Sequence, residues 1–176
     1  MTSASLLIAW SAMAQVNSSS SEYTVKAAFL FHFAEFVDWP AEAFKDANTP
    51  ITYCITGEDP FHGALDDSLR AKVVGNRGMR VEHLKQGDSV QGCQVLFIGA
   101  AENKRTASIL ANVKRSAILT VGESQNFAEN GGMIEFFLEG KKIRFDINLA
   151  AVNAAKLKMS ARLLALAKTV KTAGGD

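Results

Sequence analysis

Short apolar runs alternate with helical segments through the middle of this chain. Three of these runs end at a glycine that precedes a helix start; they are residues 51–56 before Gly57, 95–98 before Gly99, and 118–121 before Gly122. This alternation is typical of strands in a parallel sheet with crossover helices. We therefore predict strands at these runs and at 79–83, and crossover helices at 61–70 and 103–115.

The pattern changes toward the carboxyl terminus. Apolar residues at 133–138 and 141–147 flank Glu139 and Gly140, which predicts a β-hairpin and therefore an antiparallel element on the same sheet. The predicted fold class is α/β: a single domain with a mixed, mostly parallel sheet, a C-terminal β-hairpin and flanking helices.

The last segment, residues 148–171, is expected to be helical with a break near 156–160. Four apolar residues recur there at the spacing of a core-facing helical stripe. They are Met159, Leu163, Leu166 and Val170.

An apolar helix is predicted near the amino terminus. Ser19 and Glu22 form a capping-box signature, and the helix is expected to run to about Asp38. A helix that is apolar almost all round is either buried on both sides or covered by a partner. Thr24, His32, Glu35 and Asp38 form one narrow polar stripe along this helix. Phe31 falls inside that stripe, so it is the foremost candidate for contact outside the domain. The candidate partner-binding residues are Phe29, Phe31, Phe33, Phe36 and Trp39.

Before this helix lies a short apolar stretch that ends at Ala12-Met13-Ala14. Residues 1–14 are interpreted as a signal peptide with cleavage after Ala14. Residues 15–21 are expected to be a polar linker, 22–172 the folded domain, and 173–176 a disordered tail. The alternative, a buried first helix, is disfavoured by the Ser-rich linker. These expectations place the protein in the periplasm.

Composition and charge limit the number of domains and the classes of partner that this chain can have. The chain has 176 residues, 48% of them hydrophobic and 21% charged, which suits one domain with a sizeable core. Its net charge is +1 and it contains no Lys/Arg cluster, which argues against nucleic acid as a partner.

Catalytic motifs are not found in the sequence. His32, His62 and His83 have no metal-ligand spacing and are interpreted as scaffold, so no metal and no cofactor is expected. A convergent catalytic set stays the weakest alternative, and we expect that the protein is not an enzyme.

A small-molecule site is the main alternative to a protein-binding surface. Ligands of open α/β sheets bind beyond the carboxyl ends of the strands, where three glycines are expected. The same edge is expected to carry Glu58, Asp59, Glu102 and Glu123, whose negative charge opposes a phosphate ligand. A second candidate pocket includes Asn148 and Arg162, between the hairpin and the last helix, although Asn148 can equally cap that helix. Cys54 and Cys93 can either pair or remain as buried free thiols.

A family resemblance changes this picture. The segment 23–40, YTVKAAFLFHFAEFVDWP, resembles the opening of YfiR-family domains. Further segments follow the same family order, so that the likeness covers nearly all of the chain after the expected signal. These segments are 53–57, 92–98, 120–122, 131–134, 147–149 and 157–164.

The resemblance implies a periplasmic α/β repressor, often dimeric, that acts without catalysis. It implies a Cys54–Cys93 disulfide, whereas a second cysteine pair known in the family is missing here. The implied target is the periplasmic domain of an inner-membrane diguanylate cyclase. An outer-membrane lipoprotein that sequesters the repressor is a further implied partner, and a homodimer is expected.

Overall fold

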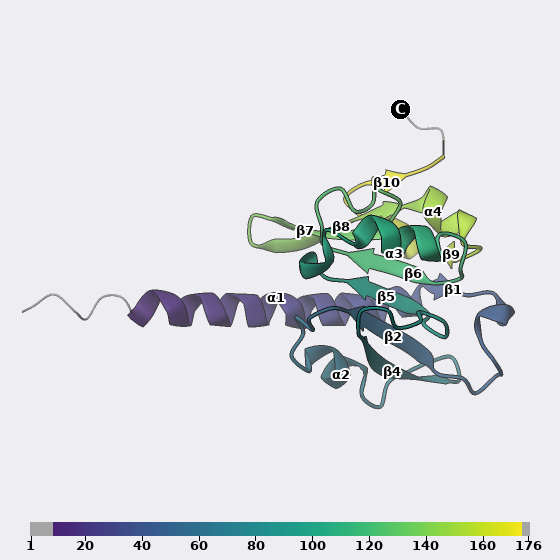
Figure 1. Cartoon of the computed structure of the whole chain (residues 1–176), viewed down its shortest axis with the longest axis horizontal. Coiled ribbons are helices and arrows are strands. Elements are labelled where there is room, and N and C mark those ends of the chain that lie inside the picture. Colours follow the sequence, from purple (N-terminus) through teal and green to yellow (C-terminus); the bar gives the residue numbers. More distant parts are fainter. Residues whose placement is uncertain (1–8, 174–176) are drawn as a thin grey trace, which may run out of the picture.

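The computed structural model of the protein describes residues 9–173, with side chains described from Ser20 onward. An eight-stranded sheet forms its centre, with the strand order β10-β8-β7-β6-β5-β2-β4-β3 (Figure 1). The strands are β2 (Ile51–Thr56), β3 (Val73–Val74), β4 (Arg77–Leu84), β5 (Val95–Ile98), β6 (Leu119–Gly122), β7 (Ile134–Glu139), β8 (Lys142–Asn148) and β10 (Val170–Lys171).

The sheet is mixed and mostly parallel. Strands β4, β2, β5, β6 and β7 run parallel to one another, whereas β8 is antiparallel to β7 and β3 is antiparallel to β4. The predicted fold class, the four predicted parallel strands and the hairpin are therefore confirmed. The hairpin turns at Gly140, which has a φ of +63° that favours glycine.

Helices cover both faces of the sheet. The core on one face includes side chains of α1 (Ala9–Glu35) and α2 (Ala64–Leu69), and the core on the other includes those of α3 (Thr106–Val113). Neighbouring residues of a strand alternate between the two cores, because side chains of a strand point to opposite faces. Tyr53 and Ile55 face α1, whereas Cys54 faces α3. This double burial explains the continuous apolar runs of the central strands.

The first helix differs from the prediction at both ends. The structure continues α1 through residues 15–21, which were expected to be a linker, so the helix does not begin at Ser19. The amino-terminal part of α1 extends beyond the sheet (Figure 1). Residues 1–8 and 174–176 lie outside the described residues. Cleavage after Ala14 and the domain boundaries stay predictions, because no observation on this chain tests them. Among residues 9–173, no helix is both long and apolar enough to cross a membrane.

At its carboxyl end α1 stops at Glu35, three residues earlier than predicted. The next residues form β1 (Val37–Asp38), which pairs antiparallel with β9 (Lys158–Met159). Ser160 extends this contact, because its amide donates to the carbonyl of Phe36 at 2.9 Å.

The single helix predicted for 148–171 is wrong. The segment forms α4 (Leu149–Ala154), β9, α5 (Ala161–Leu166) and β10. Lys156 has a φ of +59°, which ends the helical path, and the Ser160 side chain caps the new helix by accepting from the amide of Leu163. Leu163 is buried, but Leu166 is 63% exposed, so the predicted stripe does not form. The short 3-10 helices η1 (Ala41–Ala43) and η2 (Ala100–Glu102) complete the structure.

Candidate functional site

The aromatic residues of α1 contribute mainly to the core. Phe33 is fully buried, and Phe29 is half-buried. The ring of Phe33 lies 5.5 Å from that of Phe136 and 5.1 Å from that of Phe145, measured between centroids, and Phe29 contacts the same two rings. These rings join α1 to the hairpin strands β7 and β8, so Phe33 offers no surface to a partner.

Phe31 does not face outward as the sequence predicted. Its side chain is only 8% exposed, and the Nζ atom of Lys72 lies 4.0 Å from its ring centroid. The segment around α2 packs against α1 and covers the side of the helix that looked polar in sequence. A position on a helical wheel could not reveal this cover, because it comes from a segment about forty residues away.

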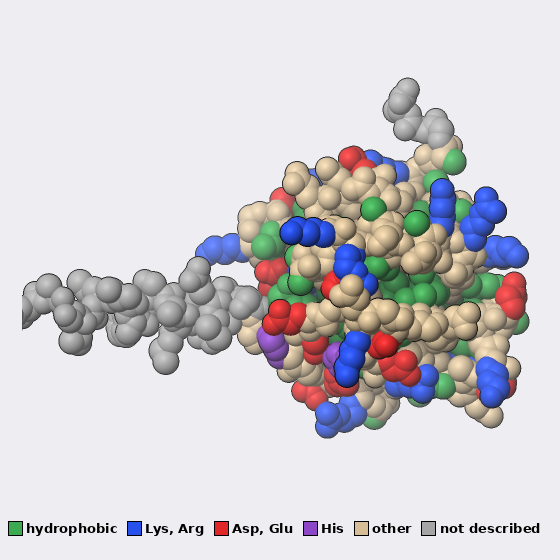
Figure 2. All heavy atoms as spheres, in the orientation of Figure 1, with side chains coloured by type: hydrophobic (Ala, Val, Ile, Leu, Met, Phe, Trp, Pro, Cys, Tyr) green, Lys and Arg blue, Asp and Glu red, His purple; other side chains and the backbone are tan. Residues whose placement is uncertain are grey.

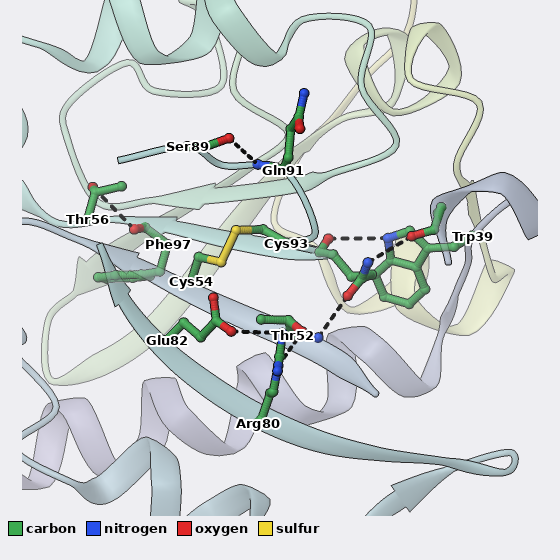
Figure 3. The surroundings of a disulfide bond; sticks show 12 residues. Trp39, Thr52, Cys54, Thr56, Arg80, Glu82, Ser89, Gln91, Cys93 and Phe97 are labelled. Carbon is green, nitrogen blue, oxygen red and sulfur yellow. Dashed lines mark hydrogen bonds and ion pairs between the residues drawn. A yellow bond between two sulfur atoms is a disulfide. The ribbon is translucent and has the colours of Figure 1, made fainter. Parts of the chain in front are cut away.

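Trp39 is held by the loop before β5. Its indole Nε1 donates to the carbonyl of Gln94 at 3.2 Å (Figure 3). The Gln94 side chain in turn accepts from the amide of Thr52 at 2.8 Å and donates to the carbonyl of Ala43 at 2.9 Å. These contacts make half-buried Trp39 a structural anchor for the chain that follows α1.

One stripe of α1 remains accessible. We call it the outer stripe of α1: Val25, Ala28, Phe29 and His32 on the helix, and Phe36 directly after its last residue. Its members recur at the spacing of one helix face. Val25 is 42% exposed, Ala28 and His32 are exposed, and the two phenylalanines are half-buried. Of the five predicted partner-binding residues, only Phe29 and Phe36 therefore lie in this accessible stripe.

The most connected polar site joins α1 to the carboxyl end of β6. The carboxylate of Glu123 accepts from the hydroxyl of Tyr23 at 3.0 Å, from Nζ of Lys26 at 2.6 Å, and from the amide of Ala100 at 3.1 Å. The Lys26 and Glu123 side chains are only 5% and 7% exposed, and Glu22 gives Lys26 a second carboxylate.

This site also perturbs an ionisable group. Burial, and then the charge of Glu123, raise the pKa of Tyr23 well above its usual value, so the hydroxyl stays a donor. Sequence reasoning missed the site. The one available signal was Lys26 on an otherwise apolar helix, but a partner 97 positions away has no local signature.

A cavity of about 590 Å³ opens beside this ion pair, at the carboxyl edge of the parallel strands. Its lining combines two aromatic rings with several carboxylates and the expected Gly99. The lining residues used below are Tyr23, Glu58, Asp59, Phe61, Asp67 and Glu123. The edge is therefore acidic, as the sequence indicated, and suits a cationic ligand better than a phosphate.

The two cysteines are joined in a disulfide. Cys54 of β2 and Cys93, two residues before β5, have Cα atoms 5.8 Å apart, and the bridge belongs to the core under α3 (Figure 3). Cys93 also lines a more polar cavity of about 700 Å³ between the 85–92 loop and α3. Figure 2 shows hydrophobic side chains in the hollow below α3, with charged side chains of both signs around it.

Asn148 and Arg162 do not form one pocket. Asn148 uses its side chain structurally, because Oδ1 accepts from the amide of Ala151 at 3.0 Å and Nδ2 donates to the carbonyl of Ala128 at 2.7 Å. It borders an apolar cavity of about 430 Å³ between α3 and α4, but exposed Arg162 on α5 is not part of that lining. The capping interpretation of Asn148 fits this geometry.

The three histidines do not form a cluster. Two of them contact a carboxylate, and the third is exposed to solvent. His32 is 2.6 Å from Glu35 and His83 is 4.0 Å from Asp59, whereas His62 is exposed. Within the described residues, no group of three or more potential ligands could hold a metal ion.

Comparison with known proteins gives both a fold relative and a family. A solved structure of a conserved domain protein from Vibrio cholerae O1 biovar El Tor str. N16961 is similar, with a TM-score of 0.50 and 9% identity. The alignment covers 74% of this chain and 57% of that one, and at such low identity it shows the fold alone. No curated protein matches the chain. A family model described as YfiR/HmsC-like matches residues 23–168, and the chain therefore belongs to the YfiR/HmsC-like family.

Proposed function

We propose that this chain is an exported regulatory protein that represses an inner-membrane diguanylate cyclase by direct contact in the periplasm. The observation that carries the proposal is the family match over residues 23–168, which is compatible with a periplasmic regulator of cyclic di-GMP signalling. The disulfide is consistent with an oxidising compartment. An outer-membrane lipoprotein that sequesters the repressor belongs to the same proposal.

Repression by contact needs a surface that distinguishes two states of the cyclase. A bound protein shifts a conformational equilibrium only by its difference in affinity for the two states. The outer stripe of α1 supplies such a surface, because Val25 and Ala28 present apolar groups that no described segment buries. The half-buried Phe29 and Phe36 extend the apolar area at its margin.

Binding to the purified periplasmic domain of the cyclase tests this surface. Val25→Asp places a charge in the stripe, so we expect affinity to fall at least about tenfold, because burying an unpaired charge is costly. Thr24→Asp is the matched control, since Thr24 is an exposed neighbour on the same helix outside the stripe. Equal affinity for both variants would exclude the stripe as the contact.

Deletion of the gene tests the repressor role itself. Cellular cyclic di-GMP should rise in the deletion strain and return to its starting level when the wild-type gene is restored. An unchanged level would refute repression, whatever surface is used for binding.

A second candidate function, a periplasmic small-molecule sensor, is favoured by the acidic cavity beside Tyr23 and Phe61. Carboxylates next to aromatic rings suit a cationic amine. A ligand that prefers the native state raises the melting temperature by mass action. A panel of small amines should therefore contain a compound that stabilises the wild-type protein but not Asp59→Asn. If no amine changes the melting temperature at millimolar concentration, the sensor function is refuted.

A further inference from the structure

The sheet has an open edge along β4. On one side β4 pairs with β2 from Met79 to Leu84, whereas on its outer side β3 pairs only with Arg77 and Gly78. In the described part of the chain, no other segment hydrogen-bonds to the outer backbone groups of residues 79–84. Such an edge is a template for a further strand, unless charged side chains protect it.

The charges on β4 are arranged so that two antiparallel copies of the strand would place opposite charges across from one another. Arg80 and Glu82 point to the same face, with side chains 55% and 42% exposed, and form an ion pair at 2.8 Å (Figure 3). In an antiparallel pair of two β4 strands centred on Val81, Arg80 of each copy lies directly opposite Glu82 of the other. Centring the pair on Arg80 or on Glu82 instead would place like charges opposite one another, which destabilises a sheet.

The fold also limits how far such pairing can extend. Because β3 occupies the outer edge at Arg77 and Gly78, a second copy can pair only from Met79 onward. A two-fold axis at Val81 matches Met79 with His83, so the free length suits this register. Two-fold pairing is the commonest symmetry of protein dimers, and it closes the edge in both copies.

We propose that the outer edge of β4 binds the same edge of a second copy of this chain, antiparallel and centred on Val81, to form one continuous sheet across a dimer. The inference does not rest on the proposed function. A five-residue strand contact is small, so we expect a weak dimer that weakens further as salt screens the Arg80–Glu82 pairs.

Charge reversal with rescue tests the register. Arg80→Glu and Glu82→Arg each place two like-charge pairs across the interface, and we expect each to raise the dimer dissociation constant about tenfold or more in sedimentation equilibrium. The double variant Arg80→Glu/Glu82→Arg restores opposite charges within and between copies, and should return to within about threefold of wild type. Arg70→Glu, in the exposed Arg70–Asp67 pair, is the control and should leave the dimer intact. Circular dichroism and melting curves confirm that each variant is folded.

A cysteine at the proposed axis gives an independent test. Residues directly opposite in an antiparallel pair have Cα atoms about 4.5–5.5 Å apart, within disulfide range. Val81→Cys should therefore form a covalent dimer under mild oxidation, with the 81–81 bridge identified by peptide mass spectrometry. Val73→Cys is the control on the same edge; Val73 is 61% exposed but lies away from the axis, so it should remain monomeric on a non-reducing gel.

Three results would overturn the proposal. The first is a wild-type chain that stays monomeric up to about millimolar concentration, because the proposed interface would produce a detectable dimer below that concentration. The single charge reversals could dimerise as well as wild type, or the double reversal could fail to restore dimerisation. Each of these results would indicate that the charges on β4 protect the edge from pairing. The gene-deletion experiment described above tests the repressor role separately, so its result would not be affected.

Discussion

The ion pair between Lys26 and Glu123 makes a sharp prediction about stability. Glu123→Ala removes the carboxylate that accepts from Lys26, Tyr23 and Ala100, and leaves the ammonium group of Lys26 buried. Because α1 is connected to β6 through this carboxylate, we expect the whole domain to lose stability, rather than the surface near the substitution alone.

The size of the loss follows from burial. Removing one partner of a buried ion pair typically costs about 3–5 kcal/mol. Lys26 keeps Glu22 as a second partner, and that side chain is 24% exposed. We therefore expect the lower end of the range, about 3 kcal/mol in the free energy of unfolding. In a chain of this size 1 kcal/mol lowers the melting temperature by about 2–4 °C, so the expected fall is about 6–12 °C.

Urea unfolding followed by circular dichroism, together with thermal melts, measures this loss. The control is Glu139→Ala, which breaks contacts to Lys168 and Arg144 at a carboxylate that is 45% exposed, and should change stability little. The double variant Lys26→Met/Glu123→Leu replaces both charges by apolar groups and should recover most of the loss. If Glu123→Ala is no less stable than Glu139→Ala, the ion pair does not hold α1 to the sheet.

Two further predictions concern the disulfide and the tyrosines. Replacing Cys54 and Cys93 together by alanine should lower the free energy of unfolding, measured in urea, by about 4 kcal/mol on the chain-entropy account. A thiol assay on the denatured, unreduced wild-type protein should find no free thiol. Two free thiols would contradict the bridge. The pKa values of Tyr23 and Tyr53 are both raised, mainly by burial, so the native state keeps both hydroxyls protonated where unfolded tyrosine ionises, at about pH 10. Their contribution to stability is therefore complete below about pH 10 and declines as the pH rises further. Absorbance at alkaline pH should show tyrosinate only as the protein unfolds, and a normal titration of the folded protein would contradict this.

The sequence predicted the candidate sites only in part, both at the carboxyl edge of the sheet and on the surface of α1. The acidic carboxyl edge was foreseen from Glu58, Asp59 and Glu123, because the ends of parallel strands must gather at one side of a sheet. The buried role of Lys26 was not foreseen, since its partner comes from a strand end that only the fold brings close. Phe31 was misplaced for the same reason, because Lys72 covers a ring that the helical pattern alone left exposed.

By itself the sequence determined the fold class, the strands β2, β4, β5 and β6, and the β7–β8 hairpin. Strands buried on both faces must be continuously apolar, and a tight turn needs a residue such as Gly140, so both leave local signals. Tertiary structure alone decided how the last segment divides into α4, β9, α5 and β10, which side chains of α1 remain accessible, and where the sheet stays open. Those outcomes depend on contacts between residues far apart in the chain, and such contacts override local propensity without leaving a local pattern.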